Sequence, residues 1–176
     1  GGSAPVIVTS PIAGRYFLVQ NQGGANTVLT QTVTPPGPAN FMHNALNTSE
    51  FNRGEVNGYV QANVVHDWLL AINPTYPTIY NQLNFPVNVN LNSTCNAYYD
   101  GASINFYRLG GGCNNTAFSV VVHHEYGHHI VATGGSGQGE YGEGMGDCMG
   151  LLITDTSKCA VGFFTNDCVN GIRDAN

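Results

Sequence analysis

The sequence predicts an α+β fold in which a β-rich amino-terminal part precedes the helices. Three observations predict it. Residues 1–40 alternate β-branched and polar side chains between Gly and Pro residues, a pattern typical of short strands. From about Glu55 to Ile72, apolar residues recur at three- and four-residue steps, which indicates a helix. Helical patterns return in residues 116–133 and 142–154, so strands come first and helices later, the order of an α+β domain.

Proline and glycine residues between these segments support the assignments. The proline-rich stretch Thr34–Asn40 is expected to be a loop, and Pro74 ends the first helix. Residues 85–92 alternate apolar and polar side chains and predict a strand, and residues 103–108 predict another. A glycine-rich loop over 110–115 then leads into the second helix, which Gly134 and Gly135 are expected to end. We expect residues 1–176 to form a single domain.

Composition excludes several classes of protein. With 176 residues and 42% hydrophobic residues, the chain is long enough and apolar enough to bury a core. Only 9% of its residues are charged, the net charge is −6, and Lys158 is the one lysine. A nucleic-acid binder needs clustered Lys and Arg, so no nucleic-acid partner is expected. No apolar run approaches the roughly 20 residues that span a bilayer, so no membrane partner is expected.

The cysteines indicate an oxidising compartment. None of the five falls in a Cys-x-x-Cys pair, which argues against a thiolate zinc site. Cys95 and Cys113 bracket a hairpin-like stretch, and Cys159 and Cys168 bracket a loop, so both pairs are predicted to be local disulfides. Cys148 is left over and is expected to be a buried thiol. Together with a surface rich in Asn, Gln, Thr, Ser and Gly, this pattern predicts a secreted protein.

The second helix carries the motif His124-Glu125-Tyr126-Gly127-His128. Residues four apart lie one helical turn apart on the same face, so both imidazoles can bind one metal ion. Glu125 is offset by one position, where it can take a proton from a water molecule beside the metal. The motif predicts a zinc site with Glu125 as general base.

A hydrolytic zinc site needs a third protein ligand. Glu143, in a glycine-rich stretch after the motif helix, is the leading candidate, and Asp147, four residues later on the same face, can accept the remaining ring N–H of a histidine ligand. Glu140 is the alternative ligand, but Gly144 stands four residues after it and offers no such acceptor. Val131 stands where a metzincin pattern requires Gly, which excludes a third histidine of that type.

These residues carry a resemblance to a known family. The motif at 124–128, followed by Gly142-Glu143-Gly144-Met145-Gly146-Asp147, resembles the glutamate zincins, nearest to the fungalysin and thermolysin groups of secreted metalloendopeptidases. Two further segments match in the family's order: Asn96-Ala97-Tyr98-Tyr99 resembles its substrate-binding edge strand, and Asn63-Val64-Val65-His66-Asp67 resembles a stretch of a fungalysin helix. The resemblance covers about residues 55–155.

The resemblance implies a zincin-like fold with an edge strand, an active-site helix and a helix that carries the third ligand. It implies zinc on His124, His128 and Glu143, with Glu125 as the base and Asp147 as the residue that orients a ligand. Asn96, Ala97 and Tyr98 would hold an extended peptide or protein substrate by strand addition. His66 is expected to make a structural hydrogen bond, with a position near the cleft as the alternative.

The chain also departs from the family. Only 33 residues follow Glu143, too few for the helical subdomain that supplies the oxyanion donor, and Arg173 is the one weak candidate for that donor. We expect the amino-terminal half of a catalytic domain, truncated or nicked by autolysis rather than a minimal enzyme. Its own carboxy-terminal subdomain, or the nicked fragment, is then a partner. Secreted members of the family often bind calcium, and the candidate ligands are Asp155, Asp167 and Asp174, although their scatter favours a solvated acidic surface.

The sequence therefore predicts a secreted zinc metalloendopeptidase. The alternative is a catalytically incomplete zinc-binding fragment or substrate-binding module of a larger peptidase. Retention of Glu125 favours the enzyme, because a purely structural zinc site needs no base. An aminopeptidase is a weaker third possibility, since no acidic cluster for a substrate amine accompanies the predicted edge strand.

Overall fold

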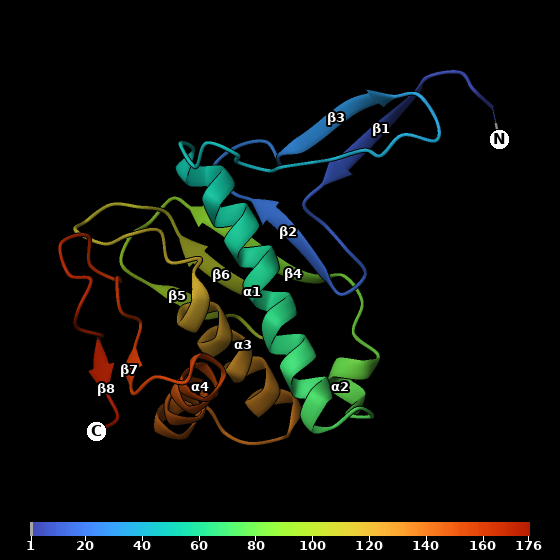
Figure 1. Cartoon of the computed structure of the whole chain (residues 1–176). Helices are drawn as coiled ribbons and strands as arrows, with labels where there is room; N and C mark the ends of the chain where they lie inside the picture. Colours follow the sequence, from blue (N-terminus) through green and yellow to red (C-terminus); the bar gives the residue numbers. More distant parts are fainter. Residues whose placement is uncertain (1) are drawn as a thin grey trace.

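A mixed four-stranded sheet lies at the centre of the computed structural model, which describes residues 2–176 (Figure 1). Its strands run in the order β2-β4-β6-β5, so β5 is a terminal strand. The β2–β4 and β4–β6 pairs are parallel, whereas β5 pairs with β6 antiparallel. The bounds are β2 (Phe17–Asn21), β4 (Phe85–Leu91), β5 (Ala97–Tyr99) and β6 (Ile104–Tyr107).

Two smaller strand pairs flank this sheet. An antiparallel ribbon of β1 (Val6–Pro11) and β3 (Val28–Val33) projects from one end of the molecule (Figure 1). A two-residue pair, β7 (Lys158–Cys159) and β8 (Arg173–Asp174), ties the carboxy-terminal segment together. The sequence predicted the strands of the first 40 residues but gave no signal for β7 and β8, because two-residue strands are too short to show a period.

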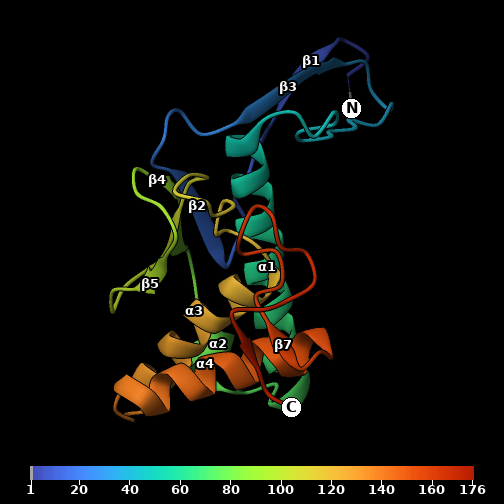
Figure 2. The ribbon, with the colours of Figure 1, turned by 90° about the vertical axis from the view of Figure 1, so that its left-hand side faces the viewer.

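Helices cover one face of the central sheet (Figure 2). The long helix α1 packs on β2 and β4, α3 packs on β5, β6 and α1, and α4 lies against α3. Their bounds are α1 (Glu50–Ile72), α2 (Pro77–Tyr80), α3 (Ser119–Thr133) and α4 (Gly139–Thr154). Within residues 2–176, no helix combines the length and the hydropathy that crossing a bilayer requires.

Small residues let α1 lie flat on the sheet. A Cβ atom added at Gly58 would lie 3.0 Å from a methyl carbon of Val89 and 3.2 Å from one of Val87, so only glycine permits this approach. Ala62, one turn later, is fully buried. The core between helix and sheet is made of β-branched and aromatic side chains, including Phe17, Val19, Val87, Val89, Ile104 and Phe106.

Glycine also brings α4 onto α3. A Cβ atom at Gly127 would lie 2.9 Å from the Cα atom of Gly146, and a Cβ atom at Gly150 would lie 2.9 Å from a methyl carbon of Val120. Gly142, Gly146 and Gly150 follow at four-residue spacing, so they form one stripe along the buried face of α4. This stripe sets the backbones of the two helices side by side.

Helix boundaries differ from those predicted, for local reasons. Helix α1 begins at Glu50 rather than near residue 55, because the Ser49 hydroxyl accepts a hydrogen bond from the Asn52 amide and caps it. Helix α3 begins at Ser119 rather than 116, since the hydroxyl of Thr116 accepts the Tyr107 amide and keeps that residue in the loop. Helix α4 begins at Gly139, three residues before its predicted start.

One of the two predicted disulfides is confirmed. Cys95 and Cys113 are bonded and close the loop that contains β5 and β6. The predicted Cys159–Cys168 disulfide is wrong: both residues are free, and the Cys159 thiol is buried, where it donates a hydrogen bond to Asp147. The prediction that Cys148 is buried is also wrong, because it lies on the exposed face of α4.

The glycine contact between α3 and α4 can be tested by substitution. Gly150→Ala should lower the free energy of unfolding by about 1–3 kcal/mol, because the new methyl group meets the Val120 side chain and backbone. Gly144→Ala is the matched control on the open face of the same helix, where nothing lies within 4 Å. It should raise the stability by up to about 1 kcal/mol, through helix propensity. Urea unfolding measures both, and equal effects would contradict the close packing.

Candidate metal centre

Helix α3 presents two histidines to a shared point. His124 and His128 are both buried, with 7% and 9% of their surface exposed, and their Nε2 atoms lie 3.1 Å apart. They come from successive turns of the helix, as the four-residue spacing predicted. The two rings lie at 80° to one another, so both nitrogen lone pairs can point at one atom between them.

Helix α4 adds a carboxylate at the same point. The Oε2 atom of Glu143 lies 3.3 Å from His124 Nε2, and its Oε1 atom lies 3.5 Å from His128 Nε2. For ligand atoms about 2.05 Å from a tetrahedral zinc ion, the expected separation is about 3.3 Å. The three observed separations match this value. Within residues 2–176, these three residues are the one group of three His, Cys, Asp or Glu side chains close enough to share an ion.

Hydrogen bonds hold a proton on Nδ1 of each ring, the nitrogen that faces away from the shared point. His124 Nδ1 lies 2.8 Å from Asp147 Oδ1, and His128 Nδ1 lies 2.8 Å from Gln138 Oε1. Both partners are acceptors, so each Nδ1 carries hydrogen and each Nε2 carries a free lone pair. Two lone pairs and a carboxylate thus face one another at 3.1–3.5 Å, a set of donor atoms that a divalent cation would bring together. The residues present therefore fit a zinc ion.

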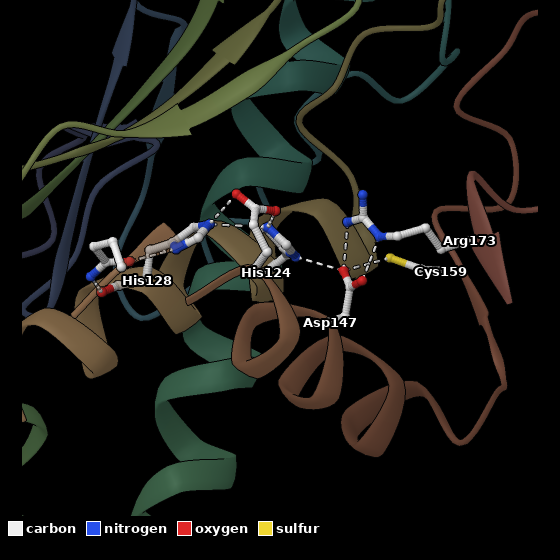
Figure 3. Close-up of polar contacts among 7 residues, drawn as sticks. His124, His128, Asp147, Cys159 and Arg173 are labelled. Carbon is white, nitrogen blue, oxygen red and sulfur yellow. Dashed lines mark hydrogen bonds and ion pairs between the residues drawn. The ribbon is translucent and has the colours of Figure 1, made fainter. Parts of the chain in front are cut away.

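Asp147 joins the metal group to the carboxy-terminal strand pair (Figure 3). The Arg173 guanidinium donates two hydrogen bonds to its carboxylate, at 2.5 and 2.6 Å, and the Cys159 thiol donates a third at 3.2 Å. Burial would raise the pKa of Asp147, but these donors and the neighbouring His124 outweigh it and hold that pKa below its usual range. Burial, reinforced by Asp147, raises the pKa of Cys159 to about 12, so the thiol keeps its proton and remains a donor.

Glu125 lies beside the three ligands. It is buried, and within residues 2–176 its Oε2 atom has no hydrogen-bond partner. Burial, together with the nearby charge of Glu143, raises its pKa to about 8, against the opposing effects of the Tyr99 amide and Arg173. This raised pKa favours the protonated form of Glu125, and a cation bound at the metal group would oppose the shift. The ionised carboxylate would then offer its unpartnered oxygen to a proton of a water molecule.

The metal group and the edge strand share one cavity of about 400 Å³. The predicted substrate-binding residues Asn96, Ala97 and Tyr98 line this cavity together with Glu125 and the metal group. Arg173 and several apolar side chains also line it: Val121, Ala160, Phe163 and Ile172. Because β5 is a terminal strand, its outer backbone groups have no partner strand within the described sheet.

Other predicted candidates lie outside the cavity lining. Glu140, the alternative third ligand, is exposed in the first turn of α4 and is not part of the metal group. His66 is fully buried, stacks on Tyr16 and bonds to Asp67, which matches the expected structural hydrogen bond. The candidate calcium ligands Asp155, Asp167 and Asp174 do not form a group of ligand atoms within residues 2–176.

Gln138 was not predicted from the sequence. It stands in the turn before α4, five residues before Glu143, and it matches no part of the motif. Its role depends on how the glycine-rich turn at 134–139 folds back over α3, which no periodicity reveals. The one available signal was its position immediately before a helix that carries a predicted ligand.

Comparison with known proteins supports the fold. The chain matches no protein-family profile, and no curated protein sequence matches it either. Among solved structures, it is similar to the precursor of protealysin, a metalloproteinase from Serratia proteamaculans, with a TM-score of 0.55 and 16% identity. The match covers 84% of this chain and 45% of that chain. At this identity the likeness shows the fold alone, and the chain spans less than half of the length of that metalloproteinase precursor.

The link between Asp147 and His124 predicts a loss of metal affinity. Asp147→Ala should weaken zinc binding by about 10–100-fold, because His124 loses the acceptor that fixes its tautomer. Asp67→Ala removes a carboxylate from His66, a histidine outside the metal group, and should leave zinc affinity unchanged. Isothermal titration calorimetry on the metal-free chains distinguishes them. Equal affinities for wild type and Asp147→Ala would refute the assignment.

Proposed function

We propose that this chain is the zinc-bearing part of a secreted metalloendopeptidase that hydrolyses peptide bonds, with zinc held by His124, His128 and Glu143. One observation carries the proposal: two imidazole lone pairs and a carboxylate converge at tetrahedral separations in a cavity that Glu125 also lines, and the buried Glu125 Oε2 atom has no hydrogen-bond partner within residues 2–176. The shared fold with a metalloproteinase precursor is consistent with it.

Zinc bound by these ligands would polarise the scissile carbonyl and make a water molecule more acidic. The chain's own residues supply the remaining chemistry. Glu125 accepts the proton of the attacking water on its free Oε2 atom and passes it to the leaving amine. Asp147 and Gln138 keep Nδ1 of each histidine protonated, so both Nε2 atoms stay available.

The outer edge of β5 is the proposed substrate-binding element. A peptide in extended conformation can add to this edge as a further strand, with its backbone bonded to the 96–98 segment. Such a peptide would lie in the cavity that Glu125 and the metal group also line. This arrangement supports a peptide or protein substrate.

A partner that completes the cleft is also proposed. Helix α4 buries its glycine stripe on α3, but its opposite face exposes Tyr141, Met145 and Leu152. These positions follow at four- and seven-residue spacing, so they lie along one side of the helix. An additional carboxy-terminal subdomain of the same protein, or a nicked fragment of it, would cover them. The alternative function, a zinc-binding fragment or substrate-binding module, would apply if that partner supplies an essential catalytic group.

Secretion is proposed from the cysteines and the polar surface. The Cys95–Cys113 disulfide closes a loop next to the cavity and requires an oxidising environment to persist. It is consistent with an extracellular peptidase.

Glu125→Gln tests the catalytic proposal. Because the amide cannot accept a proton, hydrolysis of casein or of a quenched peptide should fall by about 10²–10⁴-fold while one zinc ion per chain is retained. Glu140→Gln, an exposed acid of α4 outside the metal group, should keep wild-type activity. A chelator should abolish wild-type cleavage, and added zinc should restore it.

Two other outcomes distinguish the alternatives. Zinc binding without cleavage in the wild-type chain would favour the incomplete fragment or binding module. Cleavage that survives Glu125→Gln would refute Glu125 as the base.

A further inference from the structure

Gln138 holds His128 at two points. Its Oε1 atom accepts from His128 Nδ1 at 2.8 Å, and its Nε2 atom donates to the backbone oxygen of His128 at 3.1 Å. The second bond fixes which end of the carboxamide faces the ring, because only the NH₂ end can donate to a carbonyl oxygen. The first bond therefore presents an acceptor to the ring.

Space for this contact depends on a neighbouring glycine. A Cβ atom at Gly142 would lie 2.5 Å from Gln138 Oε1 and 3.2 Å from His128 Nδ1. Any side chain at this position would push the carboxamide away from the ring. Because Gly142 has no side chain, the Gln138 carboxamide has room beside the His128 ring.

The two histidine ligands are held by different chemistry. His124 bonds to a carboxylate that Arg173 and Cys159 anchor, whereas His128 bonds to a neutral amide in a turn with glycines at 134, 135, 137 and 139. Gln138 itself is exposed, so its side chain contributes little to the packing of the core. The Gln138 side chain makes two hydrogen bonds to His128. It does not cap α4, although it occupies the position that precedes this helix.

We propose that Gln138 is a positioning residue for the metal site: its carboxamide fixes the tautomer and the orientation of His128, and thereby sets the affinity for zinc. The inference rests on the proposed zinc site and adds a residue to it. Because the carboxamide is carried by the turn between α3 and α4, the conformation of that turn controls how well the site binds metal. Removal of the second-sphere acceptor of a histidine ligand typically weakens binding by about 10–100-fold.

Gln138→Met removes both hydrogen bonds while keeping the length of the side chain. It should weaken zinc binding by about tenfold or more, measured by competition with a chromophoric zinc chelator. Gln61→Met is the matched control, because Gln61 Oε1 bonds to the ring of His123, a neighbour on the same helix that is outside the metal group. Its zinc affinity should stay within about threefold of wild type. Gly142→Ala should reproduce the loss, since its methyl group displaces the carboxamide.

A second readout needs no metal. Long-range ¹H–¹⁵N spectra of the metal-free chain report the tautomer of each histidine, and His128 should carry its proton on Nδ1 in the wild type. In Gln138→Met the Nε2–H form should appear at His128 while His124 is unchanged. Gln138→Glu keeps an acceptor at this place and should restore the Nδ1–H form.

The outcomes separate the inference from the proposed function. A wild-type chain that binds no zinc would refute the metal site, whereas a normal wild-type affinity matched by Gln138→Met would refute only the role of Gln138. An unchanged His128 tautomer in Gln138→Met would also refute that role. An equal loss of affinity in Gln61→Met would show a general effect of amide–histidine bonds on the helix, and would overturn the inference as well.

Discussion

The close contact between α3 and α4 determines the rest of the site. Backbone meets backbone where Gly127 faces Gly146, and a Cβ atom at Gly146 would lie 2.8 Å from the His124 ring. Only at this distance can a side chain as short as Asp147 reach His124, and Glu143 reach both histidines. In α4, the buried glycines and the two acidic residues therefore recur at the same four-residue spacing, one position apart. Glycines occupy the buried face, and Glu143 and Asp147 project from positions beside it toward α3.

Charged side chains meet at this contact, although the chain has few of them. The cavity wall and the metal group contain two glutamates and an arginine, and Asp147 lies directly behind them. Within residues 2–176, four buried side-chain atoms lack a hydrogen-bond partner: three are histidine nitrogens, and the one carboxylate oxygen among them belongs to Glu125. Burying an unpaired carboxylate oxygen is costly, and such costs are typically found where chemistry uses the group. The unpaired oxygen thus supports Glu125 as the reacting base more strongly than its place in the motif alone.

The sequence predicted the structure where the spacing of residues a few positions apart was enough to place them. The helical repeat alone predicted that His124 and His128 share a face, and that Glu143 and Asp147 share another. The meeting of the two pairs, on separate helices, was implied only by the family resemblance, and the structure brings all four side chains together. The disulfide at Cys95 was predicted because it closes a local hairpin. The predicted Cys159–Cys168 pairing is wrong because β7 packs against α4, and this contact places the Cys159 thiol on Asp147, 12 residues earlier in the chain. Gln138 and the strand pair β7–β8 depend on how turns fold back across the molecule, and no local pattern encodes such a path.

The charged side chains that line the cavity bear on the choice between an endopeptidase and an aminopeptidase. An aminopeptidase requires an acidic group free to bind the substrate's terminal amine. The carboxylates that line this cavity are Glu125 and Glu143, and the proposed mechanism assigns one to the proton transfer and the other to the metal. The other charged side chain of the lining is Arg173, which bonds to Asp147 and offers no negative charge to an amine. Under the proposed function, no carboxylate of this lining is left to bind a terminal amine, so the charges of the cavity favour an endopeptidase over an aminopeptidase.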